Sequence, residues 1–396
     1  MKPRIFIGAL VLLALGFFVG RQSVLPSQLV TDVYNTESAS STEKVDFQPF
    51  WDAWNLINEK YKGTEPVDPQ TKVWGAIQGL ADSLGDPYSI FLPPDDNEAF
   101  GELISGSFGG VGMEIGEKED VLVVIAPLKG TPAERAGVRA GDMILQIDET
   151  STADLNVSEA VDLIRGESGT SVIITFFRDG DEEPHETTII REEIVVPPLE
   201  TELRSDGIFV ISLYNFDAHA TSQFRKAIQE FSNSKTDKLI IDVRGNPGGY
   251  LEAAVSIASY FLPEGEVIVR EAVDGTEENV HRSKGYARST RPLKMVVLVD
   301  QGSASASEIL AGALQENDVA KLVGTQTFGK GSVQELLPIT GDTSLKLTVA
   351  QWLTPEGKSI SDGGLTPDIV VERTPEDFEA GKDPQLDAAV KDILSR

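Results

Sequence analysis

The chain has 396 residues, of which 40% are hydrophobic and 24% charged, and its formal net charge is −29 at pH 7. Domains average roughly 150 residues, so this length indicates two or three globular units. The acidic excess repels nucleic-acid phosphate, which argues against a nucleic-acid partner. The absence of cysteine excludes disulfides, cysteine nucleophiles and thiolate zinc sites. His185, His219 and His281 lie far apart and outside any metal-ligand spacing, so neither a metal site nor a His-based triad is predicted.

The N-terminus has the pattern of an export signal. Lys2 and Arg4 precede an apolar run, 5–20, and no small-x-small cleavage site follows it. The run is longer than a signal-peptide core and shorter than the roughly 20 residues of a membrane span. We expect residues 1–24 to be a membrane anchor, with a removed signal peptide as the alternative. In either case the folded part would lie outside the cytoplasm, in a periplasm or at the cell surface, behind a flexible polar linker over 25–45.

Two aromatic-rich segments with helical spacing follow the linker. Hydrophobic residues recur every three or four positions between Phe47 and Tyr61, and again between Val73 and Leu84. These stripes predict a small N-terminal helical domain over 46–100. We expect its aromatic side chains to form a core rather than a ligand site.

From about residue 107 the pattern changes to short β-type runs broken by glycine and proline, which predicts a second domain over 101–190. The loop SFGGVGMEI (107–115) precedes one of its strands. Consecutive backbone N–H groups in such a loop form a nest for a carboxylate, and the edge strand behind it can accept an extended peptide. The loop therefore predicts a site for protein C-termini, although a Gly-rich loop alone is a weak signal. Its candidate residues are Gly110, Val111, Gly112 and Met113.

The chain then alternates strands and helices, which predicts an α/β domain over 191–375. Four apolar runs are expected as strands, and helices are expected near 218–233, from about 249 and from 305. An amphipathic helix over 376–396 closes the chain. No internal repeat is present.

Within this domain, 295–317 reads as a strand, a turn of small residues and a helix, and the turn holds Ser303, Ser305 and Ser307. Backbone N–H groups are free at the start of a helix and the helix dipole is positive there, which suits a nucleophile whose product is an oxyanion. The same position is typical of ordinary helix capping by serine. The residues alone leave open whether a serine is catalytic and which one it is.

A nucleophilic serine needs a base, and with no suitable histidine or cysteine the remaining candidate is a neutral lysine. Lys330 lies between two glycines in TFGKGSVQE (327–335), which would let the backbone pack around an inward-pointing side chain. The unperturbed pKa of lysine is about 10.4, so this residue must be desolvated or placed near positive charge. A solvent-exposed turn lysine is the alternative.

A second glycine-rich turn, DVRGNPGG (242–249), also follows a strand and opens a helix. The N–H groups of Gly248 and Gly249 are candidate donors to an oxyanion, and Pro247 stiffens their approach. An ordinary turn is the alternative.

A set of motifs spread along the chain occurs together in one known family. The motifs are GDPYSIFLPP (85–94), TPAERAGVRAGDMILQID (131–148), AVDLIRGESGTSV (160–172), DVRGNPGG (242–249), GSASASE (302–308), FGKGSVQ (328–334) and LTPEGKSISDGGLTPDIVV (353–371). From residue 47 to 372 the sequence resembles the carboxyl-terminal processing peptidases, the tail-specific serine peptidases of family S41. The resemblance implies an α/β multidomain fold. It would combine a ClpP/crotonase-like α/β peptidase core, an inserted PDZ domain and the small N-terminal helical domain.

The resemblance also implies a catalytic site. The family's nucleophile is the serine followed by Ala-Ser-Glu, with the catalytic lysine 25 positions later and a glutamine four beyond it. Here these positions are Ser305, Lys330 and Gln334. By this resemblance Ser305 attacks a peptide carbonyl, Lys330 removes and returns the proton, and Gln334 holds the lysine, with no cofactor required. The implied oxyanion hole is the N–H of Ala306 with that of Gly248 or Gly249.

The implied function is a serine endopeptidase that cleaves proteins near their C-termini, with the PDZ domain binding the substrate C-terminus and gating activity. Expected partners are proteins with accessible, apolar C-termini and, through the N-terminal segment, the membrane. A homo-oligomer or an adaptor protein is left open. Arg165, at the end of the PDZ helix, is the candidate for carrying the gating signal, and a surface charge is the alternative.

Two other classes of protein compete with this interpretation. A PDZ scaffold with a dead peptidase core would lack the dyad, which is present here. A penicillin-recognising Ser/Lys enzyme places lysine three residues after serine, whereas position 308 is glutamate. Glu308 and Arg244 are expected to have structural roles, pairing or capping nearby groups.

Overall fold

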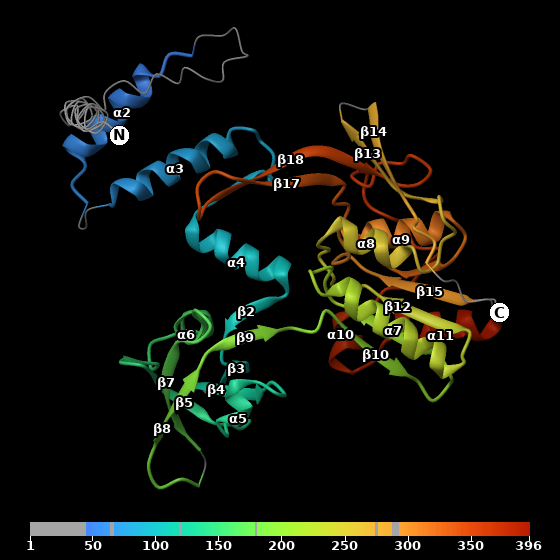
Figure 1. The fold of residues 1–396 in the computed structure, drawn as a ribbon, viewed down its shortest axis with the longest axis horizontal. Coiled ribbons are helices and arrows are strands. Elements are labelled where there is room, and N and C mark those ends of the chain that lie inside the picture. Colours follow the sequence, from blue (N-terminus) through green and yellow to red (C-terminus); the bar gives the residue numbers. More distant parts are fainter. Residues whose placement is uncertain (1–44, 64–66, 119–120, 179, 274–275, 287–292) are drawn as a thin grey trace, which may run out of the picture. The chain divides into compact units, whose positions relative to one another are not determined.

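The computed structural model describes residues 45–63, 67–118, 121–178, 180–273, 276–286 and 293–396 (Figure 1). The chain divides into two compact units, residues 1–68 and 69–396. The predicted anchor, 1–24, lies outside the described residues, as does the predicted linker apart from its last residue. In the described part, no helix is both long and apolar enough to cross a membrane.

The first unit contains one described helix, α2 (Gln48–Lys60), which buries none of its residues. Phe50 and Trp51 are 40% and 45% exposed and pack edge to face on each other, with ring centroids 5.0 Å apart. The helix itself is as predicted. The prediction that its aromatic residues form a core is wrong, because α2 buries none of them and the described residues of this unit contain no second element for it to pack against.

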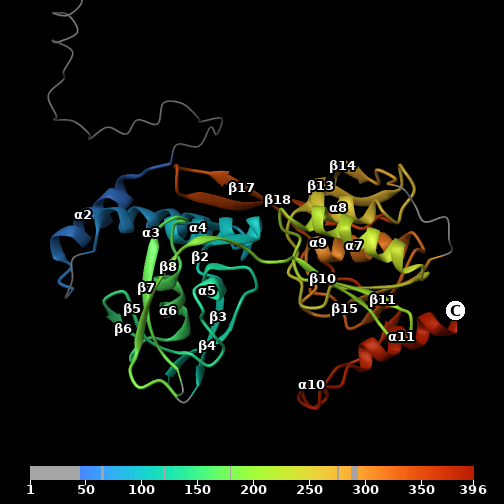
Figure 2. The same cartoon turned by 60° about the horizontal axis from the view of Figure 1, so that its bottom comes forward.

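The second unit contains a three-layer α/β domain built on a six-stranded sheet (Figures 1 and 2). The strand order is β10-β11-β12-β15-β16-β19, in which β10 is antiparallel to β11 and all other pairs are parallel. The predicted alternation of strands and helices is confirmed. The elements are β10 (Leu199–Leu203), β11 (Phe209–Leu213), α7 (Ala220–Ser234), β12 (Lys238–Asp242), α8 (Leu251–Ala258), β15 (Lys294–Val299), α9 (Ala306–Glu316), β16 (Lys321–Gly324) and β19 (Ile369–Val370).

Both faces of this sheet are buried, which is why its strands are almost continuously apolar. Successive side chains of a strand point to opposite faces. In β12, Leu239 and Ile241 belong to the core formed with α7, α8 and α9, while Ile240 belongs to the core formed with α11 (Pro384–Ser395). All three side chains are fully buried.

The C-terminal segment, expected as one helix, forms two. The first is α10 (Pro375–Glu379), whose N-cap residue is Thr374, and the second is α11. The side chain of Asp383 caps α11 by accepting a hydrogen bond from the backbone N–H of Leu386. Each helix has a proline in its first turn, where the missing N–H would have no intrahelical partner.

A second sheet of this unit is not foreseen in the sequence pattern. Its order is β1-β18-β13-β14, with β17 paired to β18. β1 (Ile90–Leu92) pairs antiparallel with β18, which places Ile90 opposite Lys346. A segment expected in the N-terminal helical domain thus adds a strand to the sheet that also contains β17, the strand that follows the Lys330 loop. The other strands are β13 (Val267–Val273), β14 (Thr276–Arg282), β17 (Ser332–Pro338) and β18 (Ser344–Leu353).

Two helices flank β1 in the sequence. α3 (Pro69–Asp82) packs Trp74 against Phe91 of β1, with ring centroids 5.5 Å apart. α4 (Pro94–Ser105) ends at Gly106, whose φ of 73° is left-handed. A Cβ atom at this position would lie 2.0 Å from Oδ2 of Asp217, so only glycine allows the end of α4 to approach the segment before α7.

The predicted PDZ domain forms a sheet of order β3-β4-β5-β7-β8, with β6 paired to β5. Its helix α6 (Val157–Ile164) packs apolar side chains into the core of this domain and begins with a capping box between Asn156 and Glu159. The ribbon β2–β9 pairs the segments where the chain enters and leaves this domain. The remaining elements are β2 (Ser107–Gly110), β3 (Met113–Lys118), β4 (Val121–Pro127), α5 (Pro132–Arg135), β5 (Met143–Ile147), β6 (Thr150–Ser151), β7 (Ser171–Phe177), β8 (His185–Ile190) and β9 (Glu192–Val195).

Candidate active site

Ser305 lies in the turn between β15 and α9, at the N-cap position of the helix. Its φ of 53° and ψ of −114° fall outside the regions that non-glycine residues ordinarily occupy. Such a conformation costs about 1–3 kcal/mol and persists only where the surroundings hold it in place. The backbone at the predicted nucleophile is therefore under local strain, as in other strand–turn–helix nucleophile sites.

The three serines of this turn have different environments. Ser303 is fully buried, and its hydroxyl donates a hydrogen bond to the carbonyl of Val243 at 2.7 Å. Ser307 is also fully buried and donates to the carbonyl of Asn246 at 3.0 Å. Ser305 is partly exposed, and its hydroxyl donates no hydrogen bond to another described residue. Ser305 is thus the one of the three whose hydroxyl is available to react.

The carboxylate of Glu308, fully buried in the first turn of α9, accepts four hydrogen bonds. Its Oε2 accepts from the backbone N–H of Ser305 at 2.9 Å and from that of Lys330 at 3.0 Å. Its Oε1 accepts from the hydroxyl of Thr327 at 2.6 Å and from the N–H of Gly329 at 2.7 Å. Because bonds of these lengths meet at Oε2, the two backbone nitrogens lie no more than about 6 Å apart. The structural role expected for Glu308 is therefore to join the two predicted catalytic segments.

The glycine turn after β12 packs directly on the turn that contains Ser305. A Cβ atom at Gly248 would lie 2.9 Å from Cβ of Ser305 and 3.0 Å from N of Ala306, so a side chain does not fit. The N–H of Gly248 donates to the side chain of Asn246 at 2.9 Å. The N–H groups of Ala306 and Gly249 have no acceptor among the described residues. Of the two predicted glycine donors, Gly249 is the one whose N–H remains unused.

Lys330 lies two residues before β17, and its side chain is partly buried. Its Nζ lies over the ring of Tyr88, 5.5 Å from the centroid. Burial lowers the pKa of Lys330 below its ordinary value, the charge of Lys346 lowers it further, and the charge of Glu308 opposes both. The structure thus meets both conditions that a lysine base requires, desolvation and a nearby positive charge.

The side chains of the predicted catalytic residues do not contact one another by hydrogen bonds. No such bond joins the hydroxyl of Ser305 to Lys330 in the described part of the chain. Gln334 lies on β17 and donates to the hydroxyl of Ser332 at 2.8 Å, not to the lysine. The structure therefore brings the backbones of Ser305 and Lys330 together and leaves their side chains apart.

The predicted carboxylate loop opens onto a cavity of about 100 Å³ between β3 and α6, which Gly110, Val111, Gly112 and Met113 all line. The carbonyl of Val111 accepts a hydrogen bond from the N–H of Ala133 at 2.8 Å. The N–H groups of Val111 and Gly112 have no acceptor among the described residues. The loop thus offers unused backbone donors at the mouth of an apolar groove, the arrangement that captures a C-terminal carboxylate.

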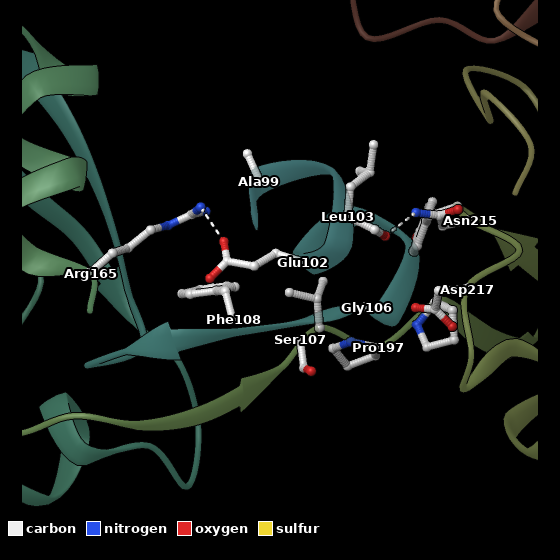
Figure 3. A pocket seen from close by; sticks show the side chains of 13 residues that line it. Ala99, Glu102, Leu103, Gly106, Ser107, Phe108, Arg165, Pro197, Asn215 and Asp217 are labelled. Carbon is white, nitrogen blue, oxygen red and sulfur yellow. Dashed lines mark hydrogen bonds and ion pairs between the residues drawn. The ribbon is translucent and has the colours of Figure 1, made fainter. Parts of the chain in front are cut away.

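A larger cavity, of about 390 Å³, lies where α4, the β2–β9 ribbon and the segment before α7 meet (Figure 3). Arg165 reaches it from the end of α6, with its guanidinium 4.4 Å from the centroid of the Phe108 ring and Nη1 2.9 Å from a carboxylate oxygen of Glu102. The carbonyl of Leu103 accepts a hydrogen bond from the side chain of Asn215 at 3.5 Å. α4 therefore contacts both the predicted PDZ domain and the three-layer α/β domain.

Sequence reasoning missed three residues that shape the site. Asn246 is fully buried: its side chain accepts a hydrogen bond from the N–H of Gly248 and donates one to the carbonyl of Leu213. The only sign of this role in the sequence is a polar residue inside a glycine turn. Thr327 binds Glu308 and precedes the lysine by three residues without any recognisable pattern. Lys346 interrupts an apolar strand, and its proximity to Lys330 depends on strand pairing that the sequence does not reveal.

Arg244 has the structural role expected for it. Its guanidinium binds the carboxylates of Asp242, at the end of β12, and Asp383, at the start of α11. It also donates to the side chain of Gln385 at 3.0 Å. These bonds fix the C-terminal helix to the edge of the sheet, outside the contacts of the predicted nucleophile.

Comparisons with known proteins identify three regions of the chain. The model of peptidase family S41 matches residues 207–371, a PDZ domain model matches 123–178, and a model described as the N-terminal domain of the activating protease CtpB matches 10–96. The chain is 36% identical over 335 residues to the carboxy-terminal processing protease CtpB of Bacillus subtilis (strain 168), covering 83% of this chain and 68% of that protein. It is 34% identical over 385 residues to CtpA of the same organism, covering 97% and 78%.

A solved structure described as a putative S41 protease from Bacteroides fragilis has the same fold, with a TM-score of 0.52 at 17% identity over 90% of this chain and 98% of that chain. The chain therefore belongs to peptidase family S41. Within that family it is a carboxy-terminal processing protease with a PDZ domain, and its substrates are proteins. The predicted S41 fold, with a PDZ domain and an N-terminal domain, is confirmed.

Replacing Glu308 by glutamine tests the carboxylate link. Glutamine has the same length but offers one oxygen and one NH₂ group, so two of the four donors lose their acceptor. We expect kcat/KM for a protein substrate to fall by roughly ten- to a hundredfold and the free energy of unfolding by about 1–3 kcal/mol. Proteolysis assays and urea unfolding measure the two effects. Glu335→Gln, on an exposed part of β17, is the matched control, and wild-type activity in Glu308→Gln would contradict the link.

Proposed function

We propose that this protein cleaves proteins near their C-termini with Ser305 as nucleophile and Lys330 as general base. The observation that carries the proposal is the buried carboxylate of Glu308, which binds the backbone N–H groups of both residues through one oxygen. A link of this kind supports a common task for two segments 25 residues apart. The partly exposed hydroxyl of Ser305 and the lowered pKa of Lys330 supply the chemistry that the task needs.

In the proposed reaction, the neutral amine of Lys330 takes the proton of the Ser305 hydroxyl while Oγ attacks the peptide carbonyl. The N–H of Ala306, at the start of α9, would donate to the oxyanion together with that of Gly249 or Gly248. Lys330 then gives the proton to the leaving amine, and water hydrolyses the acyl-enzyme by the reverse sequence of proton transfers. Gln334 would hold the lysine in its reactive position.

The separation of the side chains supports a resting state. Nζ of Lys330 lies over the ring of Tyr88, and Gln334 donates a hydrogen bond to Ser332. Because Glu308 already fixes the lysine backbone near Ser305, activation requires a change in side-chain position and not a rearrangement of the loop. A small change of this kind is within reach of a ligand that binds one state more tightly.

The PDZ groove is the proposed sensor. A substrate C-terminus would place its carboxylate on the N–H groups of Val111 and Gly112 and its last apolar side chain against α6. Arg165 lines this groove and also binds Glu102 of α4, so a peptide in the groove can alter the contact between the PDZ domain and the core. This position supports Arg165 as the carrier of the gating signal.

The proposal extends to location and partners. The basic and apolar residues before the folded part support an extracytoplasmic protease, tethered to a membrane or released after cleavage of the segment. The substrates would then be exported or membrane-attached proteins with accessible, apolar C-termini. A second copy of the chain or an adaptor that delivers substrates is compatible with this role.

Cleavage of a loosely folded protein with an apolar C-terminal tail tests the dyad. Ser305→Ala and Lys330→Ala are each expected to lower the rate at least a thousandfold, because they remove the nucleophile and the base. Ser222→Ala on α7 and Lys358→Ala on the surface are matched controls that should keep wild-type rates. Cleavage products are followed by gel and mass spectrometry. Undiminished cleavage by Ser305→Ala or Lys330→Ala would remove that residue from the mechanism and favour a scaffold role or another nucleophile.

Stimulation by a free C-terminal peptide tests the gate. We expect Arg165→Ala to lose most of the increase in rate that the peptide produces, because its contacts with Phe108 and Glu102 no longer couple the groove to α4. The increase is measured as the ratio of kcat/KM with and without peptide. Arg135→Ala removes another PDZ arginine, one that binds Glu192 outside the groove, and should keep the full ratio. A wild-type ratio in Arg165→Ala would show that the signal takes another route.

A further inference from the structure

Lys346 is a half-buried lysine without an ionic partner. It lies in the middle of β18, and its Nζ is 5.4 Å from the centroid of the Phe100 ring. It forms no ion pair or hydrogen bond with another described residue, whereas Lys358 on the surface binds the carboxylate of Glu316. Burying an unpaired charge is costly, and in a chain with 63 acidic side chains a partner is easy to supply. A lysine kept without one calls for a physical explanation.

Strand pairing brings Lys346 to the same surface as the proposed catalytic residues. β17 begins two residues after Lys330 and pairs with β18 along its whole length, with Gln334 opposite Thr348. Lys346 and Thr348 are two residues apart, so their side chains lie on one face of β18, as does that of the paired Gln334 on β17. Lys346 is therefore on the face that carries the residue proposed to hold the base.

The segment around β1 covers both lysines. Ile90 is opposite Lys346 in the sheet, and Tyr88, two residues earlier, lies against Nζ of Lys330. Phe100, on α4, lies against Nζ of Lys346. Aromatic rings exclude water and attract a cation only weakly, so neither side chain gains a full counter-charge from its ring. The two lysine side chains share one apolar cover.

The other titratable groups that face the pair have opposing effects. Asp86 precedes β1 and faces Lys346: burial raises the pKa of Asp86, but hydrogen bonds led by that of the Ser89 hydroxyl outweigh this effect and hold it below the ordinary value. The ionised Asp86 then favours the protonated form of Lys346. On the other side, Glu308 favours the protonated form of Lys330, while Tyr88 contributes its ring.

The sign of the coupling follows from these charges. Burial lowers the pKa of Lys330, and the positive charge of Lys346 is the second cause of that lowering. A general base must be neutral, so activity is lost as the pH falls through the pKa of Lys330. Removing the charge of Lys346 raises that pKa and moves the loss of activity to higher pH.

We propose that Lys346 is a positioning residue for the Lys330 base: its positive charge, held with Lys330 under the cover of Tyr88 and Phe100, favours the neutral form of the Lys330 amine. The inference rests on the proposed function, in which Lys330 is the general base. Lys346 takes no part in the proton transfer itself.

The test is the pH profile of kcat/KM for cleavage of the tailed protein by three variants between pH 6 and pH 10. Lys346→Met removes the charge and keeps most of the stem, Lys346→Gln removes it with a polar group in place, and Lys346→Arg keeps it. We expect kcat/KM of both uncharged variants at pH 7 to be at least about fivefold below the wild-type value and to recover towards wild type at high pH. Lys346→Arg should follow the wild-type profile. Thermal unfolding of Lys346→Met should occur at the wild-type temperature or above, since an unpaired half-buried charge is gone.

Each other outcome has a definite meaning. A drop in Lys346→Met and Lys346→Gln that is the same at every pH would make Lys346 a packing residue and overturn the inference. An acid limb at the wild-type position in both variants would do the same. Lys330→Ala, measured alongside, separates the role proposed for Lys346 from the dyad itself. If Lys330→Ala is inactive while the acid limb of the Lys346→Met profile does not move, only the role of Lys346 fails. If Lys330→Ala keeps its activity, the proposed dyad fails as well.

Discussion

Glu308 places a negative charge in a fully buried position, and four donors from two separate segments of the chain compensate for its lost hydration. Leaving such a charge uncompensated costs several kcal/mol, so the turn of Ser305 and the loop of Lys330 cannot separate without a large penalty. The same carboxylate directs the N–H of Ser305 and so helps to hold its strained backbone. Much of the geometry of the site follows from satisfying this one side chain.

The two lysines of the site are treated in the opposite way: Lys330 and Lys346 are half-buried, and neither forms an ion pair with a carboxylate of the described residues. Such an arrangement costs stability, and proteins retain such costs where chemistry requires them. α4 connects this region to the rest of the molecule: it carries Phe100 against Lys346 and Glu102 against Arg165 of the PDZ domain. The cover of the lysines and the contact with the peptide groove are therefore parts of one helix.

Most of the fold could be predicted from the sequence because its strands and helices follow from the spacing of apolar residues that are close together in the chain. One example is the alternation of apolar strands with helices in the six-stranded domain. Another is the turn that contains Ser305, which was recognisable as small residues between a strand and a helix. The second sheet was not predictable, because β1 pairs with β18 across more than two hundred residues. Lys346 was missed because its position beside β17 depends on long-range strand pairing. Glu308 was expected to pair or cap nearby groups, but its four donors could not be named from the sequence. The aromatic residues of α2 show that a local pattern does not predict burial: their helical spacing identified the helix but not whether another element packs on it.

The most direct test of the central claim is to find which side chain reacts with a serine-directed fluorophosphonate. The folded wild-type protein is labelled and the modified peptide is identified by mass spectrometry. We expect a single adduct on Ser305 and strongly slowed labelling in Lys330→Ala that is still folded, because the lysine activates the hydroxyl and the hydroxyls of Ser303 and Ser307 are buried and committed to carbonyls. An adduct on another serine, or equal labelling with and without Lys330, would contradict the Ser305/Lys330 dyad.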